Sequence, residues 1–364
     1  MALQRGDRLA VLTSGGDAPG MNAALRAAAR VGVEMGFEVV GIEDGYTGLL
    51  DGRVRKLDLG ALDEVARRGG TVLGTARSKV FPTAEGQARA RAQVLAAGLD
   101  GLLVIGGNGS LAGANSLAGV ATAAGRTLAV AGVPASIDND LACTAMAIGV
   151  DTAMNTIVEA IDRIYDTASA HRRTFFIEVM GRDCGYLAMT SGIAAGADAV
   201  LVPEVDKSEE DRIEHVVNVI EHAYAGETAR RRVLVIKAEG AKVDLLRLKA
   251  AVEARIAARL PDVDTRITVL GHVVRGGSPS AFDRLLGARL ANAAVRGLAA
   301  GETDFMTGWL GAGATGAASP FDPNVVMTAI PTVLEETGKL MRGETALAQW
   351  RRRVYREVEP IIAR

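Results

Sequence analysis

The chain repeats one local pattern that narrows its folding options: a short apolar run, a loop rich in glycine or acidic residues, and a helical stretch. The runs at 9–12, 102–105 and 127–133 are short and apolar, as buried parallel strands are. An Ala-rich stretch at about 21–35 predicts the first helix. Strands that alternate with helices at this spacing predict a doubly wound parallel sheet, and therefore an α/β fold.

A second set of apolar runs begins at 174–180 and continues at 199–202, 233–239 and 265–271. With 364 residues, the chain has room for two or three domains of roughly 100–200 residues each. The residues are 49% hydrophobic but only 4% aromatic, with abundant Ala and Gly, which favours helices packed closely on sheets. We therefore expect two α/β sets within one chain.

Charge and cysteine content exclude several classes of protein. A net charge of −2 gives no basic field that would attract nucleic acid. Two cysteines, Cys143 and Cys184, cannot form a disulfide framework, which indicates a reduced, cytoplasmic protein. The N-terminal residues lead directly into the first strand without a signal peptide, and no apolar run is long enough to span a membrane. We expect neither a nucleic-acid nor a membrane partner.

Glycine loops follow the predicted strands 9–12 and 102–105. The loop 13–20 lies between a strand and a helix, an arrangement that points backbone N–H groups at a phosphate, although Met21 replaces the lysine of a Walker A loop. The segment 107–112 formally matches a dinucleotide fingerprint, but no acidic residue follows about 20 positions later, which disfavours a nicotinamide cofactor. Arg77 ends another glycine loop and is either a phosphate ligand or a solvated surface cation. A phosphate-bearing ligand fits these loops.

An acidic loop follows the strand 127–133. Ser136, Asp138 and Asp140 lie where the carboxyl end of a parallel strand places ligand-binding residues. A carboxylate held by a rigid turn, such as Asp138, is a competent general base for a substrate hydroxyl. The alternative is a polar turn whose Asp and Asn residues cap the next helix.

The second half of the chain contributes cations around one glutamate. Arginine forks are the usual ligands for sugar phosphates. These groups are Arg173, Arg182, Arg266, His272 and Arg275, around Glu239. Together with glycine loops in the first half and Asp138 between the halves, they predict a phosphoryl transferase that acts on a phosphorylated sugar.

Five segments resemble signature sequences of the 6-phosphofructokinase family. They occur in the family order and span nearly the whole chain: Thr13–Asn22, Gly106–Ser110, Ile137–Asp140, Glu178–Arg182 and Val269–Pro279. The resemblance implies transfer of a phosphoryl group to the 1-hydroxyl of fructose 6-phosphate in glycolysis. It also implies a homotetramer and two Rossmann-like three-layer αβα domains with the active site in the cleft between them. The larger, nucleotide-binding domain would comprise 1–149 and about 274–324, and the smaller, sugar-phosphate-binding domain about 150–273 and 325–364.

The same resemblance assigns roles to individual residues. Asp138 would be the general base, Ser136 would touch the transferred phosphoryl group, and Arg77 and Arg182 would bridge charge on the phosphates. The ATP/ADP site would be lined by Gly16, Tyr46, Arg77, Ser78, Gly107, Asn108, Gly109, Ser110 and Gly113. The sugar-phosphate site would comprise Ser136, Ile137, Asp138, Met180, Gly181, Arg182, Glu239, His272, Val273, Val274 and Arg275, with Arg173 and Arg266 from a neighbouring subunit. Asn108 and Asp140 would hold Mg²⁺.

Two positions indicate the phosphoryl donor. Pyrophosphate-dependent members of the family have Asp and Lys where this chain has Gly109 and Ala135. Glycine at 109 leaves room for the α-phosphate of ATP, and alanine at 135 supplies no positive charge to hold pyrophosphate. We therefore expect ATP to be the phosphoryl donor. Two alternatives stay open: pyrophosphate-dependent or dual-donor catalysis, and a catalytically weak regulatory paralogue that binds sugar phosphate, which Asn108 in place of the usual carboxylate permits. At the effector site of the family, Arg26 and Arg30 match basic residues, whereas Leu59 and Tyr165 stand where further arginines are expected.

Overall fold

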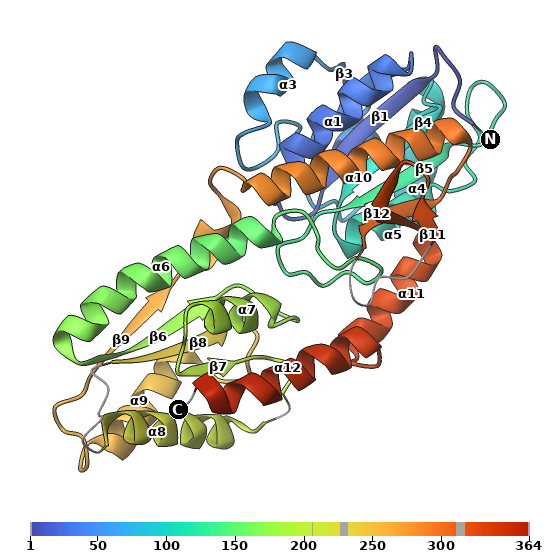
Figure 1. Ribbon diagram of the computed structural model, residues 1–364. Coiled ribbons are helices and arrows are strands. Elements are labelled where there is room, and N and C mark those ends of the chain that lie inside the picture. The colour runs from blue at the N-terminus through green and yellow to red at the C-terminus, as the bar shows by residue number, and fades with distance from the viewer. Residues whose placement is uncertain (1, 206, 226–231, 311–316, 363–364) are drawn as a thin grey trace. The chain divides into compact units, whose positions relative to one another are not determined.

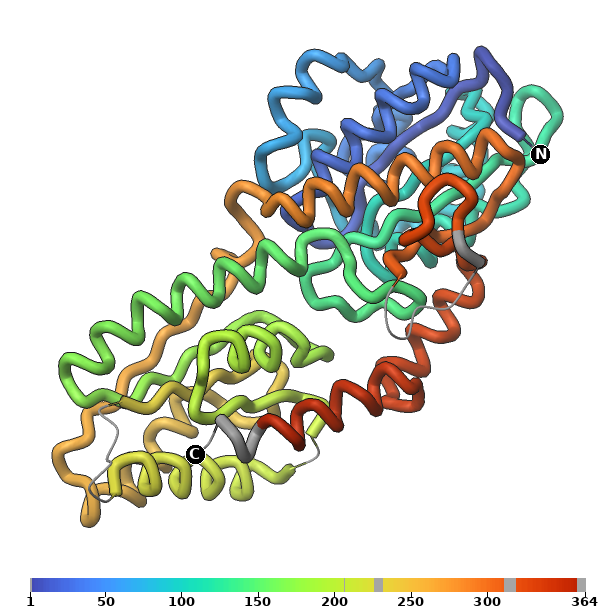
Figure 2. The backbone as a smooth tube through the Cα atoms, viewed as in Figure 1, coloured from blue at the N-terminus to red at the C-terminus, as the bar shows by residue number. Residues whose placement is uncertain are grey.

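The computed structural model describes residues 2–205, 207–225, 232–310 and 317–362. The chain divides into two compact units, each of them discontinuous (Figure 2). Unit 1 comprises Met1–Thr152 and Arg275–Arg342, and unit 2 comprises Ala153–Val274 and Gly343–Arg364. Residues 325–342 therefore lie in unit 1, whereas the resemblance placed them in the smaller domain. Their strand and helix pack on the unit 1 sheet, as described below.

Unit 1 is built on a sheet that has eight strands among the described residues, in the order β11-β12-β10-β5-β4-β1-β2-β3. The five strands from β10 to β2 are parallel, and antiparallel strands flank them at both edges. Every residue of β4 and β5 is buried, as expected for central parallel strands. The bounds are β1 (Arg8–Ser14), β2 (Glu38–Ile42), β3 (Val54–Lys56), β4 (Gly101–Gly106), β5 (Ala129–Pro134), β10 (Phe305–Trp309), β11 (Ala317–Ser319) and β12 (Asp322–Ala329).

Helices cover both faces of this sheet. The bounds are α1 (Met21–Glu34), α2 (Gly45–Asp51), α3 (Leu59–Val65), α4 (Ala84–Ala96), α5 (Asn108–Ser116), α10 (Ala281–Ala300) and α11 (Ile330–Met341). Helices α1 and α10 lie side by side on one face, and α4 and α5 lie on the other (Figure 1). Small residues allow the first pair to pack closely: a Cβ added to Gly287 of α10 would lie 3.2 Å from the backbone nitrogen of Ala24 in α1. Helix α11 packs against α5, which secures residues 330–341 to unit 1.

Unit 2 contains a parallel sheet with the strand order β7-β8-β6-β9. Its strands are β6 (Arg173–Val179), β7 (Ala199–Leu201), β8 (Val233–Ala238) and β9 (Asp264–Val269). Its helices are α6 (Val150–His171), α7 (Tyr186–Ala194), α8 (Glu209–Tyr224), α9 (Leu245–Ile256), α12 (Ala346–Ile362) and the 3₁₀ helix η1 (Gly271–Arg275). Helix α6 begins in unit 1. Helices α8 and α9 pack together over a core that contains Phe176, Val216, Ile220, Leu248 and Val252. The predicted α/β fold is confirmed in both units.

A buried carboxylate in unit 1 joins the starts of α6 and α10. Asp283, in the first turn of α10, accepts hydrogen bonds from the backbone nitrogens of Gly149 and Thr152, both at 2.8 Å, and from the Thr152 hydroxyl at 2.5 Å. Burial raises the pKa of Asp283, and these hydrogen bonds oppose that shift. Ser280 caps α10 and donates to Asp151, so the two helix starts share one polar network.

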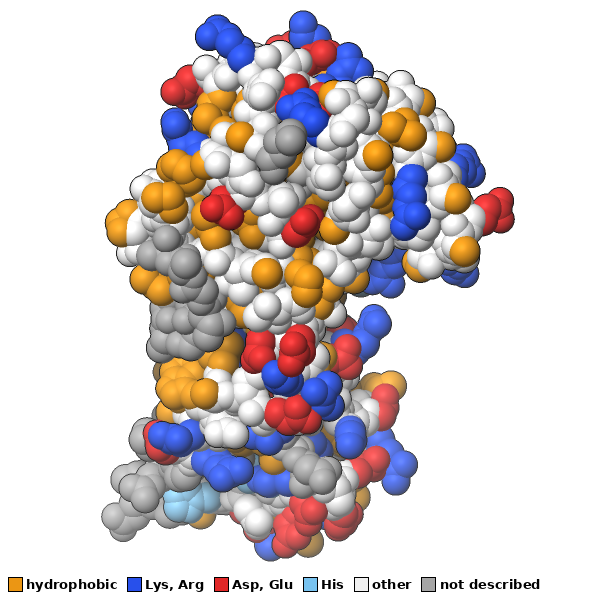
Figure 3. Space-filling model, turned by 90° about the vertical axis from the view of Figure 1, so that its right-hand side faces the viewer, with side chains coloured by type: hydrophobic (Ala, Val, Ile, Leu, Met, Phe, Trp, Pro, Cys, Tyr) orange, Lys and Arg blue, Asp and Glu red, His pale blue; other side chains and the backbone are white. Residues whose placement is uncertain are grey.

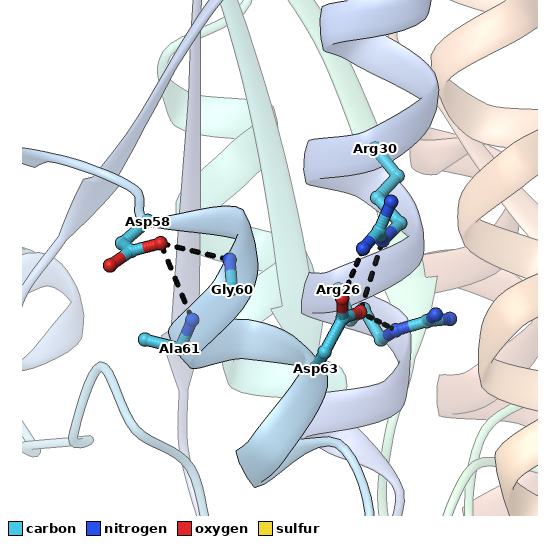
Figure 4. Close-up of polar contacts among 6 residues, drawn as sticks. All are labelled: Arg26, Arg30, Asp58, Gly60, Ala61 and Asp63. Atoms are coloured by element: carbon cyan, nitrogen blue, oxygen red, sulfur yellow. Dashed lines mark hydrogen bonds and ion pairs between the residues drawn. The ribbon is translucent and has the colours of Figure 1, made fainter.

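Helix α3 is held on α1 by one aspartate and two arginines (Figure 4). Asp58 caps α3 by accepting from the backbone nitrogens of Gly60 at 2.8 Å and Ala61 at 3.3 Å. From α3, Asp63 pairs with Arg26 Nε at 2.5 Å and also with Arg30. Hydrogen bonds from Arg30 and Arg26 lower the pKa of Asp63 to about 2. The two cations that the resemblance assigns to an effector site are thus paired with a carboxylate of the same chain.

We expect Asp63→Asn to lower the thermal unfolding midpoint at pH 7 in a pH-dependent way. A depressed pKa stabilises the fold above the unfolded-state value of about 3.9, and this contribution is lost as pH falls through the folded-state value. The difference in midpoint between wild type and variant should therefore shrink below about pH 4 and vanish near pH 2. Thermal unfolding followed by circular dichroism across this range measures it, with Glu64→Gln on the same helix as the control. A pH-independent difference would contradict the assignment.

Candidate functional site

A cavity of about 430 Å³ lies where β1, β4 and β5 of unit 1 end. Parallel strands place their carboxyl ends at one edge of a sheet, and that edge is where α/β folds bind ligands. The cavity is lined by Ser14, Gly15, Gly16, Tyr46, Ala76, Arg77, Ser78, Phe81, Pro82, Gly107, Asn108, Gly109, Ser110, Ala135, Ser136, Asp138, Asp140 and Arg275. The structure thus brings together eight of the nine predicted ATP/ADP-site residues and both predicted magnesium ligands.

The first loop of the cavity brings Gly16 against the side chain of Arg275. A Cβ added there would lie 2.6 Å from a guanidinium nitrogen of Arg275. That guanidinium donates to the backbone oxygen of Asp17 at 3.0 Å, which secures Arg275 against the loop. The neighbouring Gly15 has φ +91° and accepts a hydrogen bond from the Thr75 hydroxyl at 2.7 Å. Arg275 therefore belongs to unit 1 and faces this cavity, although the sequence analysis grouped it with the sugar-phosphate residues.

Helix α5 presents its amino terminus to the same cavity. Its N-cap is Gly107, and its first turn contains Asn108, Gly109 and Ser110. The first N–H groups of a helix lack intrahelical acceptors and carry partial positive charge, which favours a bound phosphate. Nothing lies within 4 Å of a Cβ added to Gly109, so this position faces open space. The helix end can therefore accept an anionic group at close range.

The acidic loop after β5 contributes oxygen atoms. The Ser136 hydroxyl donates to Asp140 Oδ1 at 2.7 Å, and Asp138 lines the cavity beside them. Ile137, also predicted for the site, is buried between these residues at 1% exposure. Helix α6 begins only at Val150, so the alternative that this turn caps the next helix is wrong.

One residue that the sequence analysis did not single out stabilises the acidic loop. Asn139 is fully buried and left-handed, with φ 50°. Its Nδ2 donates to Ala145 O at 3.1 Å, and its Oδ1 accepts from the backbone nitrogen of Ala147 at 3.0 Å. These bonds hold Asn139 inward, so that Asp138 and Asp140 on either side reach the cavity. In the sequence, only the place of Asn139 between two aspartates could have indicated this supporting role.

Aromatic residues close another side of the cavity. Tyr46 stacks on Phe81 with ring centroids 4.1 Å apart and donates to Ser110 O at 2.6 Å. Burial raises the pKa of the Tyr46 hydroxyl, which therefore remains a hydrogen-bond donor at neutral pH. Gly113 lies beneath the Tyr46 ring, where an added Cβ would come within 2.5 Å of it, so Gly113 does not line the cavity. Phe81 and Pro82 were missed by the sequence analysis because neither belongs to a glycine loop.

The predicted sugar-phosphate residues of unit 2 fall at two opposite ends of its sheet. At one end, the segments that follow the neighbouring strands β6, β8 and β9 contain Met180–Arg182, Glu239 and residues 272–274. The Gly240 nitrogen donates to Gly181 O at 3.1 Å, which joins two of these loops. The side chains of Arg182, Glu239, His272 and Val273 are exposed, whereas Met180 and Val274 are buried and contribute packing.

Arg173 and Arg266 lie near the amino-terminal ends of β6 and β9. Both pair with Asp264, through Arg173 Nε at 2.9 Å and an Arg266 guanidinium nitrogen at 2.5 Å. Seven strand residues, or roughly 20 Å, separate Arg173 from the loop that carries Arg182. These two arginines therefore do not join Arg182 and Glu239 within one chain.

Acidic and basic side chains are interspersed on the face shown in Figure 3. Among the described residues, no three His, Cys, Asp or Glu side chains form a metal-binding group. Asn108 and Asp140, the two predicted magnesium ligands, line the same cavity as Asp138. No described helix combines the length and the apolar character needed to cross a bilayer.

The fold and this cavity define an α/β protein whose candidate ligand site lies at the carboxyl edge of the unit 1 sheet. The sequence model of the phosphofructokinase family matches residues 8–298. The chain therefore belongs to the phosphofructokinase family.

Known relatives agree with this assignment. The chain is 47% identical over 301 residues to the ATP-dependent 6-phosphofructokinase of Natranaerobius thermophilus, a match covering 83% of this chain and 89% of that protein. It is 46% identical to the enzyme of the same name from Brevibacillus brevis, with the same coverage.

Phosphofructokinase from Saccharomyces cerevisiae has a similar structure, with a TM-score of 0.79 and 32% identity over 93% of this chain. The present chain spans 47% of that longer yeast chain. A pyrophosphate-dependent phosphofructokinase from Marinobacter aquaeolei shares the fold, with a TM-score of 0.73, 21% identity and coverage of 90% of this chain and 83% of that chain.

Proposed function

We propose that this protein is an ATP-dependent 6-phosphofructokinase, which transfers the γ-phosphoryl group of ATP to the 1-hydroxyl of D-fructose 6-phosphate in cytoplasmic glycolysis. One observation carries the proposal. The amino terminus of α5, which favours phosphates, and the acidic loop with Asp138 line a single cavity. A phosphate cradle beside a carboxylate base is what phosphoryl transfer to a hydroxyl requires.

The residues of unit 1 divide the chemistry between them. Asp138 accepts the proton of the sugar hydroxyl as that oxygen attacks the γ-phosphorus, and Ser136 contacts the transferred group. The exposed guanidinium of Arg77 offsets charge on the phosphates. The Ser136–Asp140 hydrogen bond orients both side chains before substrate arrives. Asn139 keeps Asp138 at a fixed position, and a general base needs such a fixed position to accept the proton.

Magnesium fits the oxygen donors of this cavity. Mg²⁺ is usually held by one or two carboxylates together with waters and substrate phosphates. Asn108 and Asp140 would supply an amide and a carboxylate oxygen, and nucleotide phosphates would complete the set. When bound, the ion would neutralise charge on the transferred phosphoryl group.

The space at Gly109 supports ATP as the donor. A Cβ there has no neighbour within 4 Å, so the α-phosphate has room beside α5. Ala135 also lines the cavity and contributes no cation that would hold pyrophosphate in place of a nucleotide. Pyrophosphate-dependent catalysis and a catalytically weak paralogue are therefore the less favoured alternatives.

Unit 2 would bind the sugar phosphate through Arg182, Glu239 and His272. Arg173 and Arg266 lie at the other end of its sheet, so we assign them to the sugar phosphate of a neighbouring subunit. A homotetramer with sites shared between subunits accounts for that position. Two guanidinium groups held on Asp264, that of Arg266 exposed and that of Arg173 half-buried, suit a dianionic phosphate.

A coupled assay tests the proposal directly. With saturating Mg²⁺ and fructose 6-phosphate, wild-type protein should turn over ATP but not pyrophosphate. Asp138→Asn should lower kcat by roughly 10²–10⁴-fold, the usual contribution of a general base, with little change in the KM for fructose 6-phosphate. Equal turnover with pyrophosphate would exclude the donor assignment, and near-normal kcat in the variant would exclude Asp138 as the base.

Gly109→Asp should abolish ATP turnover without disturbing the fold. Position 109 has an unstrained backbone and open space around its Cβ, so the carboxylate fits but repels and displaces the α-phosphate. Gly109→Ala is the matched control and should keep at least about a tenth of wild-type kcat/KM for ATP, because it adds no charge. Initial rates across an ATP titration measure both variants, and unimpaired turnover in Gly109→Asp would overturn the donor argument.

Mixed oligomers test the shared sites. Asp138→Asn and Arg173→Ala proteins, each inactive alone, should regain activity when refolded together, since about a quarter of randomly assembled sites would be intact. Asp138→Asn mixed with Arg77→Ala is the control, because both changes fall in the same chain's half of a site and should not complement. Confirmed hybrid oligomers that remain inactive in the first mixture would show that sites are not shared.

A further inference from the structure

Strand β8 of unit 2 contains a charged side chain in a position where burial normally requires an apolar one. Every residue of β8 is buried, and the side chain of Lys237 is only 3% exposed. An ammonium group in such surroundings is costly unless its charge and its hydrogen bonds are satisfied. The partners of Lys237 therefore indicate why a lysine is present.

The ammonium of Lys237 has an acceptor for each of its three N–H donors. It donates to Glu178 Oε2 at 2.8 Å, to Ala238 O at 3.1 Å and to Glu239 O at 3.3 Å. Glu178 is the in-register neighbour of Lys237 on β6, and its side chain is 23% exposed. The charge is thus balanced by one carboxylate, and two bonds go to the backbone where β8 ends.

The backbone at this point supports two loops of the proposed sugar-phosphate site. The Glu239 nitrogen donates to Val179 O at 2.9 Å, immediately before the loop Met180–Arg182. A Cβ added to Gly240 would lie only 1.7 Å from Arg182 O, so the two loops are in direct backbone contact. A shift of the Ala238 and Glu239 carbonyls would therefore move both Glu239 and Arg182.

We propose that Lys237 is a positioning residue for fructose 6-phosphate binding: its ammonium, paired with Glu178, holds the two carbonyls that place Glu239 beside the Met180–Arg182 loop. This inference rests on the proposed function. Lys237 is too buried to touch the substrate itself, so it acts through Glu239 and Arg182. Its effect belongs to sugar-phosphate binding and not to ATP binding, because the cavity proposed for ATP is in unit 1.

Two variants separate positioning from stability. Lys237→Met removes the ammonium and leaves Glu178 without its cation, which destabilises the fold. The double variant Lys237→Met/Glu178→Met replaces the buried pair with apolar side chains of similar size, a change that is often neutral for stability. It still lacks the bonds to Ala238 O and Glu239 O. Lys242→Met, at an exposed lysine in the following loop, is the matched control.

The double variant should unfold close to the wild-type temperature yet show a KM for fructose 6-phosphate raised by roughly tenfold or more. Its KM for ATP should stay within about twofold of wild type. The rise in unfolding temperature that fructose 6-phosphate produces should shrink in parallel, a readout that does not depend on turnover. Lys242→Met should match wild type in all three measurements.

The outcomes distinguish this inference from the proposed function. An active wild-type protein combined with an unchanged KM for fructose 6-phosphate in the double variant contradicts the role of Lys237 alone. Equal losses in the KM for ATP and for fructose 6-phosphate contradict it as well, since they indicate a general structural effect. A wild-type protein that neither binds nor phosphorylates fructose 6-phosphate contradicts the proposed function and, with it, this inference.

Discussion

Parallel pairing of β1, β4 and β5 is the constraint on which the site in unit 1 depends. Because the three strands run in the same direction, their carboxyl ends bring the loops after Ser14, Gly106 and Pro134 to one edge of the sheet. None of these loops forms a pocket alone. Glycines at the ends of β1 and β4 let the backbone approach closely, and β5 contributes the acidic side chains. The proposed phosphate-binding loops and the proposed general base are thus adjacent because of strand order.

Buried charge has different uses in the two units. In unit 1, Asp283 is held by the backbone nitrogens of Gly149 and Thr152, at the positive end of α6, so a helix terminus compensates the carboxylate. In unit 2, Lys237 is held by backbone carbonyls and by Glu178. Neither residue is among those that line the cavity at α5. Each instead fixes a chain segment, which is a use of buried charge that costs stability but specifies geometry.

Sequence reasoning located the elements whose signals are local. The apolar runs that became β1, β4, β5, β6 and β8 were predicted, because burial on both faces requires continuous hydrophobic residues. The antiparallel strands β3, β11 and β12 were missed: β3 and β11 are only three residues long, and β12 is not a continuous buried run. The unit boundary falls at 342 and not at 324 because β12 pairs with β10 and α11 packs against α5. Sequence spacing also could not show that Gly113 supports Tyr46, that Asn139 turns inward or that Arg275 reaches Gly16, because each depends on packing between distant segments.

The insertion of unit 2 between two strands of one sheet has a consequence for biosynthesis. During translation β5 emerges early, but its neighbour β10 begins at Phe305, after the whole of residues 153–274 has been made. Until then β5 is an open edge with six consecutive apolar or small residues, the kind of segment that pairs with other chains. This edge lacks its partner strand until β10 has been made, so the pace of translation across the insert sets how long the exposure lasts.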